Sequence, residues 1–321
     1  MVFTCWQTIA CRPVPHAVTP ASSADCRLVE HAAGTTCVPL SIQRLVTLDS
    51  MSFEYALSLG LQPIAAPLSQ QIPAYLRDRV VGVENIGDGG VPNLERVLAL
   101  KPDLIIGLDF NQNIYAQASQ IAPTLLLQFD HSGLWKEFLH RFSLALDRKA
   151  IGQQVMEHYN RRLQTLQRTL KAAVASDQRL PFPPQVSVVR IYPDTINLYF
   201  RESFCGTILE DAGLARPEAQ RLSGAEAKRQ FGNEIQASIS MEQVDQADGD
   251  VMFVWTSEDT AAANASAQEK LAKLQSAPLW QQLNAIKRDR IYFVPRHWLG
   301  AGPLAADAVI DDLFKYLGKQ A

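Results

Sequence analysis

The chain has 321 residues, of which 47% are hydrophobic and 20% are charged, and its net charge is −3. This length favours two domains, and this composition is that of a folded globular protein and excludes a disordered chain. The acidic balance gives no general electrostatic support for nucleic-acid binding. No apolar run approaches the roughly 18 to 20 residues that cross a bilayer, so no membrane-embedded body is expected.

The first 26 residues contain a motif that bears on attachment to a membrane. Thr8-Ile9-Ala10-Cys11 is similar to the small-residue site that precedes the lipidated cysteine of bacterial lipoproteins, and the proline-rich stretch 13–20 is typical of a tether. The apolar region before it is too short for a secretory leader, so either the true start lies upstream or the similarity is chance. We therefore expect residues 1–26 to be a signal remnant and tether, with Cys11 as the lipidation candidate.

Residues 27–146 alternate between strand-like and helix-like segments, as a parallel α/β sheet requires. The expected elements are a hairpin at 27–39, strands at 44–48, 64–66, 104–108 and 125–129, and helices at 52–59 and 92–100. Together these elements predict a first α/β lobe.

A long amphipathic segment follows at 148–177. Its apolar positions at helical spacing are Ile151, Val155, Met156, Tyr159, Leu163, Leu166 and Leu170. A helix of about 28 residues extends roughly 42 Å, which is enough to join two lobes. We place the interlobe helix at 147–178 and a second lobe at 179–321. The predicted fold class is α/β, with two α/β lobes that have parallel central sheets and are joined by one long α-helix.

The five cysteines, Cys5, Cys11, Cys26, Cys37 and Cys205, lack the C-x-x-C spacing of a metal or redox site. Only Cys26 and Cys37 flank the expected hairpin. A turn at residues 33–34 would leave Cys26 roughly 13 Å along the strand from the position opposite Cys37, which is too far for a disulfide. A turn at residues 31–32 would bring the two cysteines opposite each other, so the sequence leaves this disulfide open.

One phrase occurs in both halves of the chain. Asn93-Leu94-Glu95-Arg96-Val97 and Ser240-Met241-Glu242-Gln243-Val244 each lead, eight residues after the glutamate, to an aspartate that precedes an apolar strand. Glutamate in a first helical turn is favourable on dipole grounds alone. That explanation does not account for a glutamate at the same place in both lobes. The repeated placement predicts two exposed carboxylates on one face of the molecule. A partner with two matching arginines would bind that face.

Motifs for catalysis are missing. The glycine loop 87–90 would need a third glycine at Pro92 to bind a dinucleotide, and neither a P-loop, a G-x-S-x-G elbow nor an H-E-x-x-H helix occurs. The six histidines lack ligand spacing, so we expect no metal ligated directly by the protein. An enzyme that acts on a small anion in the cleft remains the weaker alternative.

Ligands of open α/β sheets bind outside the carboxyl ends of the strands. The candidate ligand-binding residues at these ends are Ser50, Phe110, Asn111 and His131 in the first lobe, and Arg190, Tyr192, Tyr199, Arg201, Trp255 and Trp298 in the second. Arg190 ends a buried strand, which indicates an anion or a carboxylate partner. The alternatives are a structural salt bridge for Arg190, core packing for the tryptophans and a solvated loop for His131.

The order of several segments resembles a known family. These are the hairpin 29–34 leading to Val38-Pro39, then 44–46, 86–87, 92–95, 100–107, 290–294, Trp298, 302–306 and 311–313. Along 27–317 the chain resembles the iron-siderophore type of periplasmic substrate-binding protein. This is the ferric-citrate and ferric-hydroxamate type of ABC importer receptor. Its members have a helical linker between the lobes, a fold known as the class III periplasmic-binding-protein fold.

The resemblance implies binding, with no chemistry and no resident cofactor. The implied cargo is a ferric siderophore or ferric citrate, held between the lobes near Arg190 and Trp298; cobalamin, haem or free metal is the alternative. Glu95 and Glu242 match the paired glutamates that dock onto arginines of a membrane permease, whose ATPase is a separate chain. A monomer in the periplasm or on the outer face of the cytoplasmic membrane is expected. The arginine-rich first-lobe pocket of some members is missing, which leaves the chelate open.

Overall fold

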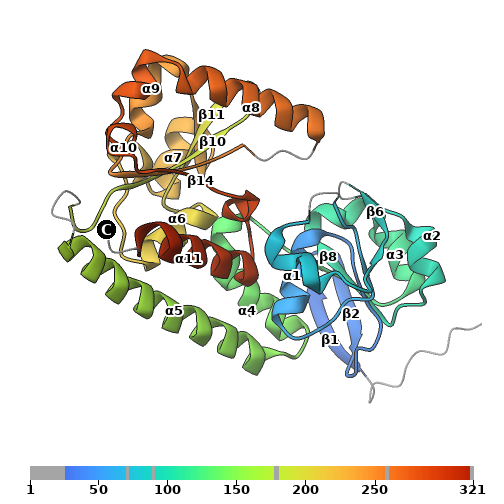
Figure 1. Ribbon diagram of the computed structural model, residues 1–321. Helices are drawn as coiled ribbons and strands as arrows, with labels where there is room; N and C mark the ends of the chain where they lie inside the picture. Colours follow the sequence, from blue (N-terminus) through green and yellow to red (C-terminus); the bar gives the residue numbers. More distant parts are fainter. Residues whose placement is uncertain (1–25, 70–71, 89–90, 177–180, 257–259, 319–321) are drawn as a thin grey trace, which may run out of the picture.

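The computed structural model describes residues 26–69, 72–88, 91–176, 181–256 and 260–318. It contains two α/β lobes, one blue to teal and one yellow to orange in Figure 1, and a long helix that runs along one side of the molecule. This helix, α5 (Lys149–Ser176), has 28 residues. The predicted fold class is therefore confirmed. Among the described residues, every helix is too short or too polar to cross a bilayer.

The N-terminal lobe is built on a five-stranded parallel sheet in the order β5-β4-β3-β8-β9. The strands are β3 (Leu45–Thr47), β4 (Ala65–Ala66), β5 (Glu84–Asn85), β8 (Leu104–Leu108) and β9 (Thr124–Leu127); the helices are α1 (Ser50–Ser58), α2 (Leu94–Ala99), α3 (Tyr115–Ile121) and α4 (Trp135–Ala145). Every residue of β3, β8 and β9 is buried, because helices cover both faces of a parallel sheet. Their near-continuous apolar runs made these strands readable in the sequence.

Two hairpins border this lobe: β1 (Cys26–His31) with β2 (Gly34–Pro39), and β6 (Gly87–Asp88) with β7 (Val91–Pro92). In the first hairpin, His31 pairs with Gly34, so the turn is at residues 32–33. This position lies between the two turns that the sequence left open, at 31–32 and 33–34. Cys37 then lies opposite Leu28, two residues from Cys26 on the same face of the strand. The two cysteine Cα atoms are 5.5 Å apart, and the cysteines form a disulfide.

The C-terminal lobe has a mixed sheet in the order β12-β11-β10-β13-β14. Its strands are β10 (Val186–Ile191), β11 (Ile196–Tyr199), β12 (Gln236–Ile239), β13 (Val251–Trp255) and β14 (Ile291–Phe293). Strand β11 runs antiparallel to both neighbours, in contrast to the fully parallel sheet that we expected here. The physical reason is the connection of four residues between β10 and β11, which permits a hairpin and is too short for the crossover that parallel strands need.

Helices and short 3₁₀ segments complete the chain. The helices of the C-terminal lobe are α6 (Phe204–Asp211), α7 (Gly224–Phe231), α8 (Ala261–Gln275), α9 (Pro278–Gln282), α10 (Asn284–Lys287) and α11 (Pro303–Leu317). The 3₁₀ segments are η1 (Ala74–Arg79), η2 (Asp109–Ile114), η3 (Ser132–Leu134), η4 (Glu218–Gln220), η5 (Met241–Ala247) and η6 (Arg296–Leu299).

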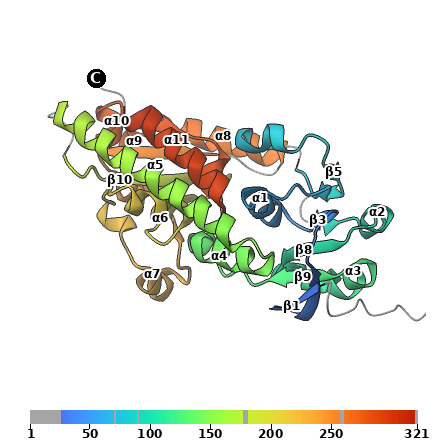
Figure 2. The same cartoon turned by 90° about the horizontal axis from the view of Figure 1, so that it is seen from below.

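The lobes contact each other directly in addition to sharing α5. Helix α11 packs along α5, as both views show (Figures 1 and 2), and also contacts α1 and α4. Trp135 of α4 donates a 3.2 Å hydrogen bond from its indole to the hydroxyl of Thr207 on α6. Lys136 of α4 forms an ion pair with Asp211, which also accepts a 2.6 Å hydrogen bond from Tyr159 on α5. These bonds tie the first lobe, the long helix and the second lobe together.

Candidate functional site

A cavity of about 410 Å³ lies between the lobes. Its walls are Asp49, Ser50, Met51, Glu54, Pro67, Ser69, Pro73, Tyr75, Leu76 and Phe110 from the N-terminal lobe, and Arg296, His297, Leu299, Gly300 and Ala301 from the C-terminal lobe. A volume of this size is within the range of small-molecule sites. We call it the interlobe pocket. It includes two of the ten predicted ligand-binding residues, Ser50 and Phe110.

Two strand ends place the N-terminal wall of this pocket. Asp49 follows β3 and caps α1, accepting hydrogen bonds from the Ser52 backbone (2.7 Å) and hydroxyl (2.9 Å). This cap sets Ser50 at the edge of the pocket. Burial raises the pKa of Asp49 to about 6, although the bonds from Ser52 act in the opposite direction. Phe110 follows β8 and is 53% exposed, so it offers an apolar surface to a ligand.

The C-terminal wall comes from η6, which follows β14. His297 lies there with its Nε2 2.7 Å from Asp312 Oδ2 on α11, and the Tyr75 ring of the first lobe lies edge-on to it at 6.2 Å. Arg296 precedes His297 and adds a cation to the same wall. The sequence reasoning missed both residues, because it passed from the strand end directly to Trp298. The strand-end rule, applied one or two residues earlier, would have found them.

Trp298 and Asn111 are core residues in this structure. Trp298 has no exposed surface, stacks on Phe253 at 4.4 Å and donates its indole hydrogen to Asp312 at 2.9 Å. Asn111 is 3% exposed, and its side-chain oxygen accepts a 3.0 Å hydrogen bond from the Leu108 backbone. Both side chains therefore have structural partners here, and ligand contact by either stays a prediction.

Four other candidates form one cluster in the C-terminal lobe. Arg190, which is 7% exposed, lies with its guanidinium over the Tyr192 ring, and the rings of Tyr199 and Trp255 are 5.0 Å apart. Burial raises the pKa of Tyr199, with Tyr192 adding to the shift and Arg190 opposing it. Trp255 lines a separate cavity of about 540 Å³ at the carboxyl end of β13, together with Phe293. The structure thus groups these four residues away from the walls of the interlobe pocket.

The two remaining candidates have charged partners. His131 lies with its Nε2 3.5 Å from Glu234 of the opposite lobe, in a groove of about 600 Å³ that Lys228 also lines. Arg201 forms a 2.5 Å ion pair with Glu210, and both side chains of this pair are largely exposed. Neither His131 nor Arg201 lines the interlobe pocket.

Glu95 and Glu242 occupy corresponding positions in the two lobes. Glu95 lies in the first turn of α2, after the edge strand β5, and Glu242 lies in the first turn of η5, directly after the edge strand β12. Both side chains are exposed. A hydrogen bond with Ser240 lowers the pKa of Glu242, so this carboxylate is charged at neutral pH.

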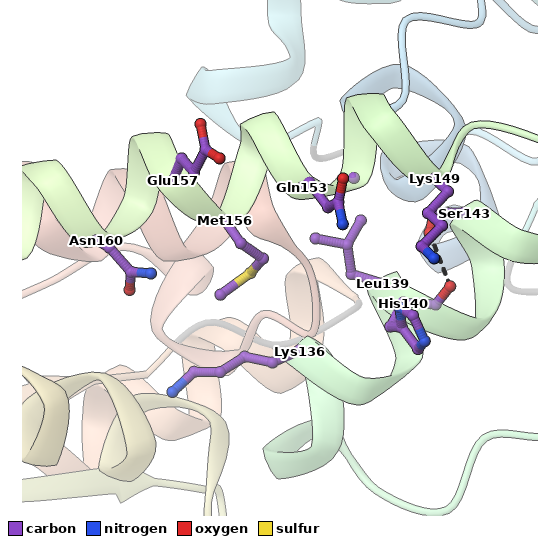
Figure 3. Close-up of a pocket in the computed structure, with 10 residues that line it drawn as sticks. Lys136, Leu139, His140, Ser143, Lys149, Gln153, Met156, Glu157 and Asn160 are labelled. Atoms are coloured by element: carbon purple, nitrogen blue, oxygen red, sulfur yellow. Dashed lines mark hydrogen bonds between the residues drawn. The ribbon is translucent and has the colours of Figure 1, made fainter.

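A further cavity, of about 350 Å³, lies between α4 and α5 (Figure 3). Lys136, His140 and Lys149 contribute cationic or polar groups, and Leu139 and Met156 contribute apolar surface. It lies between helices rather than at the carboxyl ends of strands, so the interlobe pocket is the better candidate for a ligand. The part of the chain that the structure describes contains no group of three or more His, Cys, Asp or Glu side chains placed to hold a metal ion.

Two α/β lobes, one long connecting helix and a cavity between the lobes define a binding protein of the helical-linker type. Residues 45–297 match the model of the family described as periplasmic binding protein, and the chain belongs to this family. Its relatives are binding proteins, among them one of Bacillus subtilis that is named putative ABC transporter substrate-binding lipoprotein YhfQ and is 26% identical. The prediction that the chain is not an enzyme is therefore confirmed, as is the family resemblance.

Three similar proteins are informative. The probable siderophore-binding lipoprotein YfiY of Bacillus subtilis is 34% identical over 306 residues, which cover 93% of this chain and 90% of the relative. The achromobactin-binding periplasmic protein of Dickeya dadantii is 29% identical over 282 residues, which cover 86% of this chain and 87% of the relative. The crystal structure of Staphylococcus aureus SirA with staphyloferrin B aligns with a TM-score of 0.75 and 26% identity, over 91% of this chain and 98% of SirA.

Proposed function

We propose that the chain is the substrate-binding component of an ABC importer and that it binds a ferric siderophore in the interlobe pocket. The observation that carries this proposal is a ligand-sized cavity walled by both lobes, in a chain whose relatives include siderophore-binding proteins. The cavity lies at the carboxyl ends of β3, β8 and β14, where ligands of such sheets bind.

The chemistry of the pocket suits a metal that arrives already chelated. A ferric siderophore presents polar or negative oxygens around a buried ion, and Arg296 with His297 supplies donors for such oxygens. Phe110 supplies an apolar wall. We infer that iron is cargo and that the protein keeps no resident cofactor. Ferric citrate is a second cargo of the same chemical class, and a citrate-binding relative, YfmC of Bacillus subtilis, is 24% identical.

Delivery to a membrane permease is the finer part of the proposal. Glu95 and Glu242 lie at matching sites of the two lobes, which suits a permease with two cationic docking sites. The permease and its ATPase are separate chains. The proposed location is the periplasm or the outer face of the cytoplasmic membrane, and the proposed state is a monomer. The lipidation candidate Cys11 lies outside the described residues and stays a prediction.

Calorimetric titration of the purified chain tests cargo binding. The ligands are ferric and iron-free siderophores of several classes, ferric citrate, haem, cobalamin and ferric chloride. We expect saturable binding of an iron-loaded siderophore, weaker binding of its iron-free form, and a loss of about tenfold in affinity when Arg296→Gln removes one charge-assisted hydrogen bond. Lys149→Gln, in the cavity between α4 and α5, is the matched control and should bind normally.

Other outcomes of this titration would overturn parts of the proposal. Binding of haem or cobalamin alone would replace the cargo and keep the receptor role. Binding of ferric chloride alone would show that the protein ligates the metal itself. A loss of siderophore binding in Lys149→Gln but not in Arg296→Gln would move the cargo to the other cavity.

A further inference from the structure

A buried glutamate joins the two lobes beside the interlobe pocket. Glu54 lies on α1 of the N-terminal lobe and is 5% exposed. Its Oε1 accepts a 2.9 Å hydrogen bond from the backbone of Ala305, in the first turn of α11. Its Oε2 accepts a 3.0 Å hydrogen bond from the hydroxyl of Tyr75. One carboxyl group therefore contacts both lobes and a residue of the pocket wall.

The chain around α11 is shaped to receive this carboxyl group. A Cβ at Gly302 would lie 2.5 Å from Glu54 Oε1 and 2.7 Å from the carboxyl carbon, so a larger residue there would have to displace the carboxyl group. The neighbouring Tyr55 donates a hydrogen bond from its hydroxyl to the carbonyl of Ala301. Leu304 packs into the small apolar cluster of Phe53, Leu57, Ala66 and Leu76 in the first lobe. The start of α11 is thus held by polar and apolar contacts from the opposite lobe.

Helix α11 connects this contact to the other wall of the pocket. Ala305, Val309 and Leu313 belong to the hydrophobic core that includes the C-terminal lobe, so the helix packs as part of that lobe. Asp312 on the same helix accepts hydrogen bonds from His297 and Trp298 of η6. A displacement of α11 from Glu54 would therefore carry the His297 side of the pocket with it.

Stability alone does not explain a carboxyl group here. Burial of a carboxylate costs free energy that its partners only partly recover, and apolar residues of similar volume often serve packing as well. Burial raises the pKa of Glu54, while the bonds from Ala305 and Tyr75 act in the opposite direction. Directional hydrogen bonds, unlike apolar packing, fix one relative orientation of the two elements that they join.

We propose that Glu54 is a positioning residue for the interlobe pocket. By bonding Tyr75 and the first turn of α11, it holds the Arg296–His297 wall at one distance from the N-terminal wall. This inference rests on the proposed function only in taking the cargo to be a ferric siderophore. The effect on the distance between the lobes does not depend on the cargo. Loss of Glu54 would let the lobes sample other separations, of which a fraction is competent to bind. If that fraction falls to about one tenth, the apparent Kd rises about tenfold.

The test combines an interlobe distance with a binding measurement on the full chain. Spin labels are placed on exposed sites of the two lobes, Gln117→Cys on α3 and Ser266→Cys on α8, after Cys5, Cys11 and Cys205 are replaced by serine or alanine. Pulsed electron resonance gives the distance distribution without cargo. Calorimetry gives the affinity for the ferric siderophore that the unlabelled protein binds best.

We expect Glu54→Ala to broaden the distance distribution and to weaken binding about tenfold, mainly through slower association, because only the competent fraction of the free protein binds cargo. Glu54→Gln, which keeps the shape and one acceptor, should show a smaller effect, and the surface control Glu269→Ala should match the original chain. Should Glu54→Ala fail to fold, Gly302→Ala offers a second way to separate α11 from the carboxyl group.

An unchanged distance distribution in Glu54→Ala, with only a lower melting temperature, would reduce Glu54 to a purely structural contact. An unchanged distribution in Gly302→Ala would likewise overturn the positioning role. Absence of siderophore binding by the unaltered chain would instead overturn the proposed function. The distance measurement needs no cargo, so the two failures are distinguishable.

Discussion

The guanidinium carbon of Arg190 lies 4.0 Å from the centre of the Tyr192 ring. Arg190 is in β10, where Trp255 of β13 pairs with it, and it is 7% exposed. A nearly buried arginine that stacks on an aromatic face gains a cation–π interaction that lysine does not reproduce with the same geometry. The structure places an aromatic ring against this residue, and the anion or carboxylate partner that the sequence indicated stays a prediction.

A double-mutant cycle measures this contact. Arg190→Met and Tyr192→Leu, singly and together, should show a coupling of about 2 kcal/mol in the free energy of unfolding by urea. The desolvated position of Arg190 places the expected value above that of an exposed pair. Strictly additive effects would mean that the stacked geometry contributes no stability.

The disulfide of the first hairpin should stabilise the N-terminal lobe. Cys26 and Cys37 are 11 residues apart, and closing a loop of this length corresponds to about 3 kcal/mol in the chain-entropy treatment. We expect the double replacement by serine to lower the free energy of unfolding by that order. Reduction of the original chain by dithiothreitol should have the same effect and should leave the double variant unchanged. Equal stability of the oxidised and reduced chain would contradict the prediction.

Asp49 should make stability depend on pH. Its pKa is raised from 3.8 to about 6 in the folded state, so the folded protein binds the proton more tightly than the unfolded chain does. The associated stability is fully present below pH 3.8 and is lost as the pH rises through 6, with a size on the order of 3 kcal/mol. The substitution Asp49→Asn removes the titrating carboxyl group and keeps a residue that also caps helices well.

Guanidinium unfolding between about pH 3.5 and 7.5 checks this prediction. The stability of Asp49→Asn relative to the original chain should increase across the window from about pH 4 to 6. Parallel pH profiles for the two proteins would show that Asp49 keeps an ordinary pKa in the fold.

If Glu95 and Glu242 dock onto the permease, replacing them should impair transport and leave siderophore binding intact. We expect Glu95→Lys with Glu242→Lys to leave the affinity for the siderophore unchanged and to lower uptake by the cognate permease at least about tenfold, because like charges then face each other at the contact. Glu269→Lys, an exposed change on α8, is the control. Impaired siderophore binding with normal uptake per bound complex would refute the docking role.

Much of the fold could be predicted because its signals are local. The buried strand β8 is an uninterrupted apolar run, and the interlobe helix has apolar residues at helical spacing over 28 residues. The register of the first hairpin could not be fixed, since residues 31–34 permit a turn at 31–32 or 33–34, and the structure has it at 32–33. The direction of β11 depended on a short connection that the sequence reasoning did not weigh.

The candidate site was predictable where it follows from strand ends. Ser50 and Phe110 were found by that rule, and Arg296 and His297 obey it as well. Glu54 lies in the middle of a helix, and its burial depends on where α11 packs, which is a tertiary contact 251 residues away in the chain. Trp298 is fully buried here, and an aromatic residue near a cleft is indistinguishable in sequence from one that packs in the core, so its contact with a ligand stays a prediction.

The interlobe pocket is the proposed binding site of the ferric siderophore. The most direct test is X-ray diffraction at the iron absorption edge from crystals of the chain grown with the ferric siderophore that binds it best. We expect one anomalous peak in the interlobe pocket, between Phe110 of the first lobe and the Arg296–His297 turn of the second. A fully occupied peak in the cavity between α4 and α5, or in the groove beside His131, with the interlobe pocket empty, would contradict it.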